Sequence, residues 1–156
     1  MGPQWALDVG IAPEAALARL GGAINQRPKR AFGVLKVQKE FVGAIASEHF
    51  EIWERSQRAV HGVGRFSAVS GGTRVEMRFL VPPITKALIV VFFALYAVAA
   101  GGFVLGARDA TVALANVIFG VGGAVILAIL FTSAARRQRA DLGAFLERLF
   151  GDVPRV

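Results

Sequence analysis

The side chains that could do chemistry in this chain are few, and they do not converge. The chain has two histidines, His49 and His61, and no cysteine. The strand register derived below places His49 opposite Ser67 and His61 opposite Arg55, so the two imidazoles are not adjacent ligands. A metal site needs several converging ligands, whereas disulfides, thiolate nucleophiles and cysteine-ligated clusters all need cysteine. We therefore expect no catalytic residues, no metal site and no cofactor, and we predict that the protein is not an enzyme.

Patterns that bind phosphate or nucleic acid are also missing. The glycines of Gly62-Val63-Gly64 and Gly71-Gly72 lie in predicted strands and turns. Because they do not open a helix, they form no phosphate cradle. The formal net charge of +7 could indicate a nucleic-acid partner. The basic residues are interleaved with Glu, however, and membrane topology accounts for the excess, so we predict no nucleic acid among the partners.

Two apolar runs dominate the second half of the chain. Residues 87–107 and 110–135 contain no Asp, Glu, Lys, Arg or His. About 20 apolar residues in a helix cross the hydrocarbon core of a bilayer, and a helix satisfies its own backbone in lipid. The sequence therefore predicts a transmembrane hairpin over residues 82–135, with Arg108 and Asp109 in its short loop. Spans without ionisable groups are not typical of an ion or proton pathway.

Basic residues beside the spans set the expected orientation. Lys86 precedes the first span, and Arg136, Arg137 and Arg139 follow the second. Because positive residues remain on the cytoplasmic side, we predict an integral membrane protein with both termini cytoplasmic. The N-terminus has no basic segment followed by an apolar core, which argues against a signal peptide. The predicted parts are a cytoplasmic head over residues 1–81, the hairpin over 82–135 and a cytoplasmic tail over 136–156.

The head has the pattern of a small α+β domain. Residues 13–20 predict a helix, because Pro13 suits a first turn and Glu14 complements the helix dipole, and Gly21-Gly22 predicts a stop or a kink. From about residue 32 the apolar positions alternate, which predicts strands near 40–46, 49–55, 61–69 and 73–81. Paired glycines after Ser70 give the strongest hairpin signal. We predict an N-terminal helix plus a four-stranded antiparallel meander.

A register follows from requiring one apolar face. Pairing Ala46 with His49, Phe50 with Phe66 and Val69 with Arg74 gathers the apolar side chains on one side of the sheet, whereas a slip of one residue would mix in polar ones. We expect the N-terminal helix to cover this face. Its predicted members are Phe41, Ile45, Phe50, Ile52, Phe66, Ala68, Val75, Met77 and Phe79.

The opposite face combines polar and apolar rows in the same register. The polar row is Glu51, Arg65 and Arg78, and the apolar row, near Pro82, is Val42, Trp53, Val63 and Leu80. Three interpretations of the apolar row remain open: Trp53 anchors at the lipid headgroups, the row contacts a partner subunit, or residues 31–39 bury it. With Trp53 on this non-core face, we expect Trp53→Ala to leave the head folded.

Small residues in the spans favour close helix contact. Gly102 and Gly106 lie four residues apart, and such pairs let helices approach closely in lipid. They pack either the two helices of the hairpin or a further partner helix. Tyr96 and Asn116 are the notable polar residues in the spans, and we expect each to make an interhelical hydrogen bond.

The tail has the pattern of an amphipathic helix. Leu142, Phe145 and Leu149 recur at helical spacing, and Arg136, Arg137 and Arg139 supply a basic side. Such a helix lies on the cytoplasmic leaflet, or it docks its apolar stripe on a partner.

Several short motifs carry a resemblance to a known kind of protein. Phe41-x-Gly43, Phe50-x-Ile52 and Gly72-Thr73-x-Val75-x-Met77 are followed by Pro82-Pro83 and the hairpin. In this arrangement the chain resembles small bacterial membrane proteins with a β-rich N-terminal head and a C-terminal transmembrane hairpin. The resemblance covers about residues 40–135. It implies a bacterial inner membrane and no known activity.

The expected function is that of a non-catalytic accessory or assembly subunit of a larger membrane complex, such as a respiratory or photosynthetic one. Its expected partners are membrane lipids and other membrane subunits. The alternative is a membrane-anchored module that binds or senses a small ligand or an anionic lipid. Its headgroup contacts would be Lys36, Lys39, Arg55 and Arg58, with Arg136, Arg137 and Arg139 from the tail. A homo-oligomeric pore is disfavoured, because neither span has a polar stripe.

Overall fold

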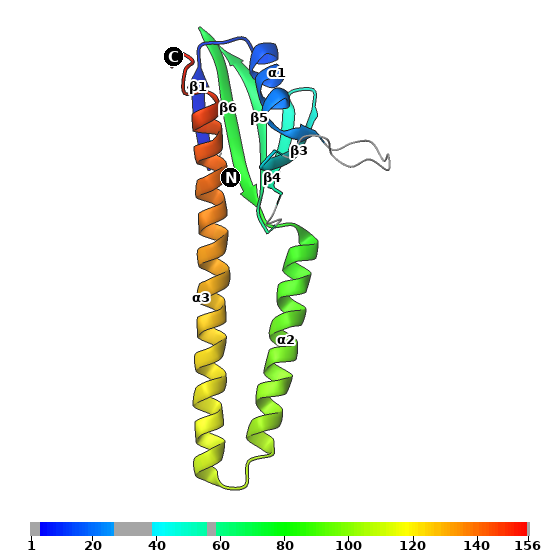
Figure 1. Cartoon of the computed structure of the whole chain (residues 1–156), viewed down its shortest axis with the longest axis vertical. Coiled ribbons are helices and arrows are strands. Elements are labelled where there is room, and N and C mark those ends of the chain that lie inside the picture. The colour runs from blue at the N-terminus through cyan, green and yellow to red at the C-terminus, as the bar shows by residue number, and fades with distance from the viewer. Residues whose placement is uncertain (1–3, 27–38, 56–58, 156) are drawn as a thin grey trace. The chain divides into compact units, whose positions relative to one another are not determined.

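The structure, a computed structural model, describes residues 4–26, 39–55 and 59–155. The chain divides into two compact units, which are described separately below. We call Met1–Val81 together with Arg137–Val156 the head, and Pro82–Arg136 the hairpin. Figure 1 shows the strands gathered in the head and the two long helices of the hairpin.

The head contains one sheet of six strands. Their order across the sheet is β1-β6-β5-β4-β3-β2, and only the pairing of β2 with β3 is parallel. The four predicted strands are present as β3 to β6, but β1 and β2 add one strand at each edge, so the predicted four-stranded sheet was too small. The bounds are β1 Trp5–Val9, β2 Asn25–Gln26, β3 Phe41–Ala46, β4 His49–Glu54, β5 His61–Val69 and β6 Gly72–Leu80.

The strand pairing agrees with the predicted register at one hairpin and differs by two residues at the others. Ala46 pairs with His49, as predicted. Phe50 pairs with Gly64 instead of Phe66, and Val69 pairs with Gly72 instead of Arg74. Because side chains alternate with a period of two, a shift of two residues keeps every side chain on its predicted face. It changes only which residues lie opposite one another.

One face of the sheet forms the core of the head. Phe41, Phe50, Phe66 and Met77 are almost fully buried there. Helix α1 (Pro13–Ala23) packs on this face and runs through Gly21-Gly22 without stopping. A Cβ at position 43 would lie 2.8 Å from Cδ1 of Ile24, so Gly43 lets this residue approach the sheet closely. We call this side of the sheet the covered face.

The C-terminal end of helix α3 (Ala110–Leu149) also packs on the covered face. Leu142 and Leu146 are buried, and the ring of Phe145 stacks on Phe41 with centroids 4.2 Å apart. Figure 1 shows this end of the helix, in red, beside β1. The predicted amphipathic stripe therefore exists, but it completes the core of the head. The predicted separate tail lying on a membrane or a partner was wrong, because the stripe finds its apolar partner within the chain.

Polar contacts fasten the C-terminal residues of the head to α1 and its preceding loop. Arg19 donates from Nε to the carbonyl oxygen of Leu149 at 2.6 Å and also pairs with Asp152. The backbone N–H of Gly10 donates to the carbonyl of Pro154 at 2.7 Å. Together with the buried stripe, these bonds make residues 137–155 an integral part of the head.

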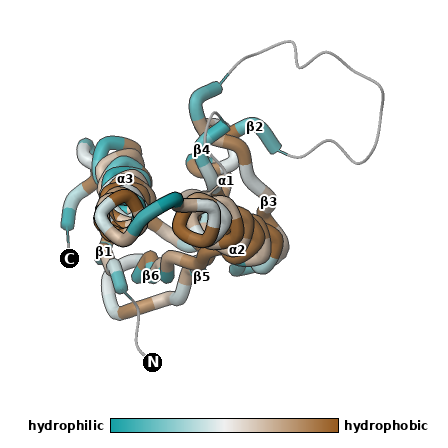
Figure 2. Tube along the Cα trace, turned by 90° about the horizontal axis from the view of Figure 1, so that it is seen from below, coloured by the Kyte–Doolittle hydropathy of each residue, from teal (hydrophilic) through white to brown (hydrophobic). Residues whose placement is uncertain are grey.

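The hairpin consists of α2 (Pro83–Leu105) and the first part of α3. Both helices are long and apolar enough to cross a membrane, with mean hydropathies of 2.6 and 2.4 over their most apolar windows. Figure 2 shows the apolar colouring along α2. No residue of α2, which the structure describes in full, is buried. The hairpin therefore has almost no core of its own.

Two hydrogen bonds join the helices of the hairpin. The hydroxyl of Tyr96 donates to the carbonyl oxygen of Gly120, and the side-chain amide of Asn116 donates to that of Phe103, both at 2.9 Å. The predicted interhelical roles of Tyr96 and Asn116 are confirmed. A Cβ at position 123 would overlap the hydroxyl oxygen of Tyr96, so Gly123 is needed for this close approach.

Candidate functional site

The face of the sheet opposite the core carries the polar side chains of the strands. We call it the open face. Neither α1 nor the end of α3 packs on it, because their buried residues meet the covered face. Alternation along the paired strands places on it Val42, His49, Glu51, Trp53, His61, Val63, Arg65, Arg74, Glu76, Arg78 and Leu80, together with Asp8 from β1.

The two-residue shift in pairing rearranges the rows of this face. The predicted row of Glu51, Arg65 and Arg78 is not formed. Glu51 instead lies opposite Val63, which lies opposite Arg78, and the neighbouring row is His49, Arg65 and Glu76. The shift therefore places Arg65 beside Glu76, with its Nε donating to Oε2 at 2.9 Å.

Hydrogen bonds from basic side chains occupy three carboxylates of the open face. Besides Glu76, Glu51 lies 2.6 Å from Nδ1 of His61, and Asp8 accepts two bonds of 2.8 Å from the guanidinium of Arg74. These hydrogen bonds, helped by the positive charge of Arg74, hold the pKa of Asp8 below its ordinary value. Glu76 and Asp8 thus neutralise Arg65 and Arg74 on this face.

The apolar row differs from the prediction at its centre. Trp53 lies opposite His61, not Val63, and its ring stacks on the imidazole with centroids 4.8 Å apart. Trp53 is only 1% exposed, so the predicted surface anchor is wrong. Val42 is 9% exposed and Leu80 is 53% exposed, so Leu80 is the most accessible of the predicted row. The alternative in which residues 31–39 bury the row falls mainly outside the described residues.

The predicted lipid-binding cations do not form one cluster in the structure. The ammonium of Lys39 donates to the carbonyl oxygens of Gly22 and Ile24, the latter at 3.3 Å, and so binds the end of α1. Arg55 is exposed, and Lys36 and Arg58 lie outside the described residues. Arg136, Arg137 and Arg139 are exposed on α3. Lys39 is therefore engaged within the head and is not displayed for a headgroup.

The remaining predicted contact residues divide between core and surface. Leu142 is buried in the head, and Phe145 and Leu149 are partly buried there. These three side chains are therefore not presented to a partner. Gly102, by contrast, has open space where its Cβ would lie, and Gly106 approaches only the carbonyl of Gly102 in its own helix. These two glycines do not pack the two helices of the hairpin together.

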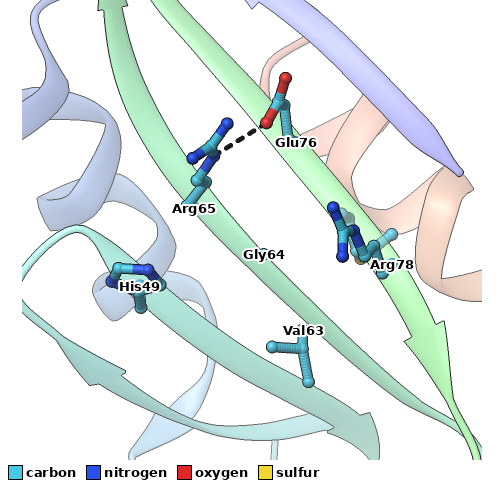
Figure 3. Close-up of a pocket in the computed structure, with 7 residues that line it drawn as sticks. His49, Val63, Gly64, Arg65, Glu76 and Arg78 are labelled. Atoms are coloured by element: carbon cyan, nitrogen blue, oxygen red, sulfur yellow. Dashed lines mark hydrogen bonds and ion pairs between the residues drawn. The ribbon is translucent and has the colours of Figure 1, made fainter. Parts of the chain in front are cut away.

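A hollow lies at the centre of the open face. It has a volume of about 280 Å³ and is lined by His49, Val63, Gly64, Arg65, Glu76, Met77 and Arg78. Figure 3 shows the side chains of Arg65, Arg78 and His49 around Gly64, with Glu76 beside Arg65. Sequence reasoning missed this group, because the predicted pairing placed Ser67, not Arg65, opposite His49.

The described residues give no indication of metal chemistry. Within 4–26, 39–55 and 59–155, no group of three His, Cys, Asp or Glu side chains could hold a metal ion.

Comparison of the chain with protein-family models, with curated proteins and with solved structures finds no match. Any function must therefore be argued from the head, its open face and the hairpin.

Proposed function

We propose that this protein is an integral membrane protein that serves as a non-catalytic accessory or assembly subunit of a larger membrane complex. The observation that carries the proposal is an asymmetry of burial. The head closes its core with its own α1 and α3, whereas the hairpin leaves its large apolar side chains exposed. A hairpin of this kind needs lipid or other helices around it.

The orientation follows from the charges that flank the hairpin. Lys86 lies in the first turns of α2, and Arg136, Arg137 and Arg139 follow the apolar part of α3. The loop between the helices carries Arg108 and Asp109, which offset each other. The positive-inside rule then puts the head in the cytoplasm and the loop on the other side.

The glycines of α2 support a helix partner. Gly101 and Gly102 have no heavy atom within 4 Å of where their Cβ atoms would lie, apart from their own helix. Small residues at lipid-exposed positions of a helix let a neighbouring helix approach the backbone of that helix. In this proposal a transmembrane helix of a partner subunit packs on this side of α2, and the head presents its open face to the cytoplasmic part of the complex.

Isolation of the intact chain from its native membrane in a mild detergent tests the proposal. We expect a partner in fixed stoichiometry by native mass spectrometry. Gly102→Leu should reduce its retention, because the added side chain fills the approach without a clash inside the hairpin. Val90→Leu, at a position that is 67% exposed on a different face of α2 from Gly102, is the matched control and should retain the partner. A native protein that migrates alone would contradict the proposal.

A further inference from the structure

We propose that the hollow around Gly64 on the open face binds a phosphate group, carried by a soluble ligand or by a phospholipid headgroup. This site is separate from the cations predicted at the lipid surface. It goes beyond the accessory function and does not depend on it. Three strands contribute to it, because β4 supplies His49, β5 supplies Arg65, and β6 supplies Arg78.

The hollow contains more positive than negative side chains. Arg65 is paired with Glu76, whereas Arg78, among the described residues, makes no ion pair or side-chain hydrogen bond. Asp8 and Glu51 do not line the hollow; Asp8 is paired with Arg74, and Glu51 is hydrogen-bonded to His61. The two arginines and Glu76 give the hollow a charge of +1 with His49 neutral, so an anion would balance it.

The donors of the hollow are arranged for a group with several oxygens. Arg65 uses Nε for Glu76, and its side chain is 60% exposed, so its terminal nitrogens remain accessible. Arg78 lies across Gly64 from His49, and both side chains are exposed (Figure 3). Guanidinium groups match phosphate and carboxylate oxygens in a forked geometry. Donors on three sides suit a tetrahedral phosphate better than a planar carboxylate.

Glu76 has two opposing effects in this site. Its bond holds Arg65 in place on the sheet, and its side chain is only 18% exposed. Its charge also opposes a bound anion. Removing the charge should therefore strengthen binding, provided Arg65 remains near the hollow. Because such charge effects fall with distance in salt, a gain in phosphate affinity would indicate that the anion binds near Glu76.

The test uses the full-length chain in nanodiscs of phosphatidylcholine, titrated with inorganic phosphate at constant ionic strength. NMR follows the backbone amide of Gly64 and the Nε–H groups of the arginines. We expect a saturable shift of these signals. Arg78→Gln should weaken the apparent affinity by about tenfold or more, because a charge-assisted hydrogen bond is lost. Glu76→Gln should tighten it severalfold.

Arg74→Gln is the matched control. Arg74 lies on the same strand and face and carries the same charge, but it is bound to Asp8 outside the hollow. Its replacement should leave phosphate binding within about twofold, since only the long-range field changes. Equal losses in the two variants would show general attraction to a positive surface and overturn the proposal. A shift that does not saturate would also overturn it.

A second arm identifies the source of the phosphate. Nanodiscs containing phosphatidylglycerol are examined without added phosphate. A shift at Gly64 that Arg78→Gln abolishes assigns the site to a lipid headgroup. If the lipid produces no shift and inorganic phosphate still binds, the ligand is soluble. Either result supports the site, whereas the absence of a response in both arms refutes it.

Discussion

The head and the hairpin treat apolar side chains in opposite ways. In the head, Leu142 is 1% exposed and Leu146 is fully buried, whereas Val98 and Leu105 in the hairpin are 74% and 88% exposed. Both units contain helices with large apolar side chains, but α1 and the end of α3 also carry charged residues, whereas the two spans carry none. The difference lies in whether the chain itself provides a covering surface. The head does, through the sheet, and the hairpin requires an apolar environment or another helix.

Trp53→Ala should produce the largest effect on the head. The indole is 1% exposed although it lies on the open face, so its removal leaves a large cavity. We expect a loss of about 3–5 kcal/mol in the free energy of unfolding. Leu80→Ala, at a side chain that is 53% exposed, should cost well under half as much. Hydrogen exchange of the β4 and β5 amides in the detergent-solubilised chain measures both.

This expectation reverses the one from the sequence alone, in which the head of the Trp53→Ala variant remains folded. If the variant exchanges its β4 and β5 amides no faster than Leu80→Ala does, the burial of Trp53 is not structural. The membrane or partner contact that the sequence suggested would then be favoured again.

A leucine pair tests the comparison between the two units directly. Leu146→Ala in the head should lower the free energy of unfolding by about 2–5 kcal/mol, because it opens a cavity against the sheet. Leu88→Ala in the hairpin, where the side chain is 64% exposed, should have a much smaller effect on thermal unfolding in detergent. Equal effects would mean that the hairpin has a core like that of the head.

Glycines in the hairpin provide a smaller, internal test. Gly123→Ala places a methyl group where the Tyr96 hydroxyl lies, so the interhelical hydrogen bond should be disturbed at a cost of about 1–3 kcal/mol. Gly122→Ala meets nothing within 4 Å and should be neutral or slightly stabilising through helix propensity. Exchange of hairpin amides in nanodiscs compares the two. A neutral Gly123→Ala would show that the helices are not held at this contact.

The Asp8–Arg74 pair should produce the smallest effect, and one that depends on pH. The pKa of Asp8 is lowered in the folded head, so its contribution to stability is present above its unfolded pKa of 3.8 and is lost as the pH falls through the folded value. Asp8→Asn should therefore flatten the pH dependence of head stability in this acidic range. Comparing its thermal unfolding with that of the parent chain at pH 6 and pH 3 measures the difference. An unchanged pH dependence would mean that the pair does not persist in solution.

Local patterns in the sequence were sufficient for four of the six strands and for the apolar face of the sheet. Alternation marks β3 to β6, and a pairing error of two residues does not move a side chain to the other face. The contact of Phe41 with Phe145 could not be predicted in the same way, because it joins segments far apart in the chain. The apolar stripe near the C-terminus was visible, but the surface that it covers was not.

The candidate site was harder to predict than the core, for a related reason. Its composition depends on which charged residues lie opposite one another, and the same two-residue shift that leaves the core unchanged brings His49, Arg65 and Glu76 into one row. The burial of apolar side chains determines which face of the sheet is covered. It does not distinguish two strand pairings that differ by two residues. Likewise, β2 has only two residues, Asn25 and Gln26, which is too few to show alternation.

Labelling of single cysteines tests most directly whether the hairpin spans a membrane. The chain has no cysteine, so one can be introduced at Ser70 in the head, at Arg108 in the loop, at Ala140 after the second span or at Leu95 within the first. In sealed vesicles we expect a membrane-impermeant maleimide to label positions 70 and 140 from one side and position 108 from the other. Position 95 should react only after detergent is added. Reaction of position 95 in intact vesicles, or labelling of positions 70 and 108 from the same side, would contradict a membrane-spanning hairpin.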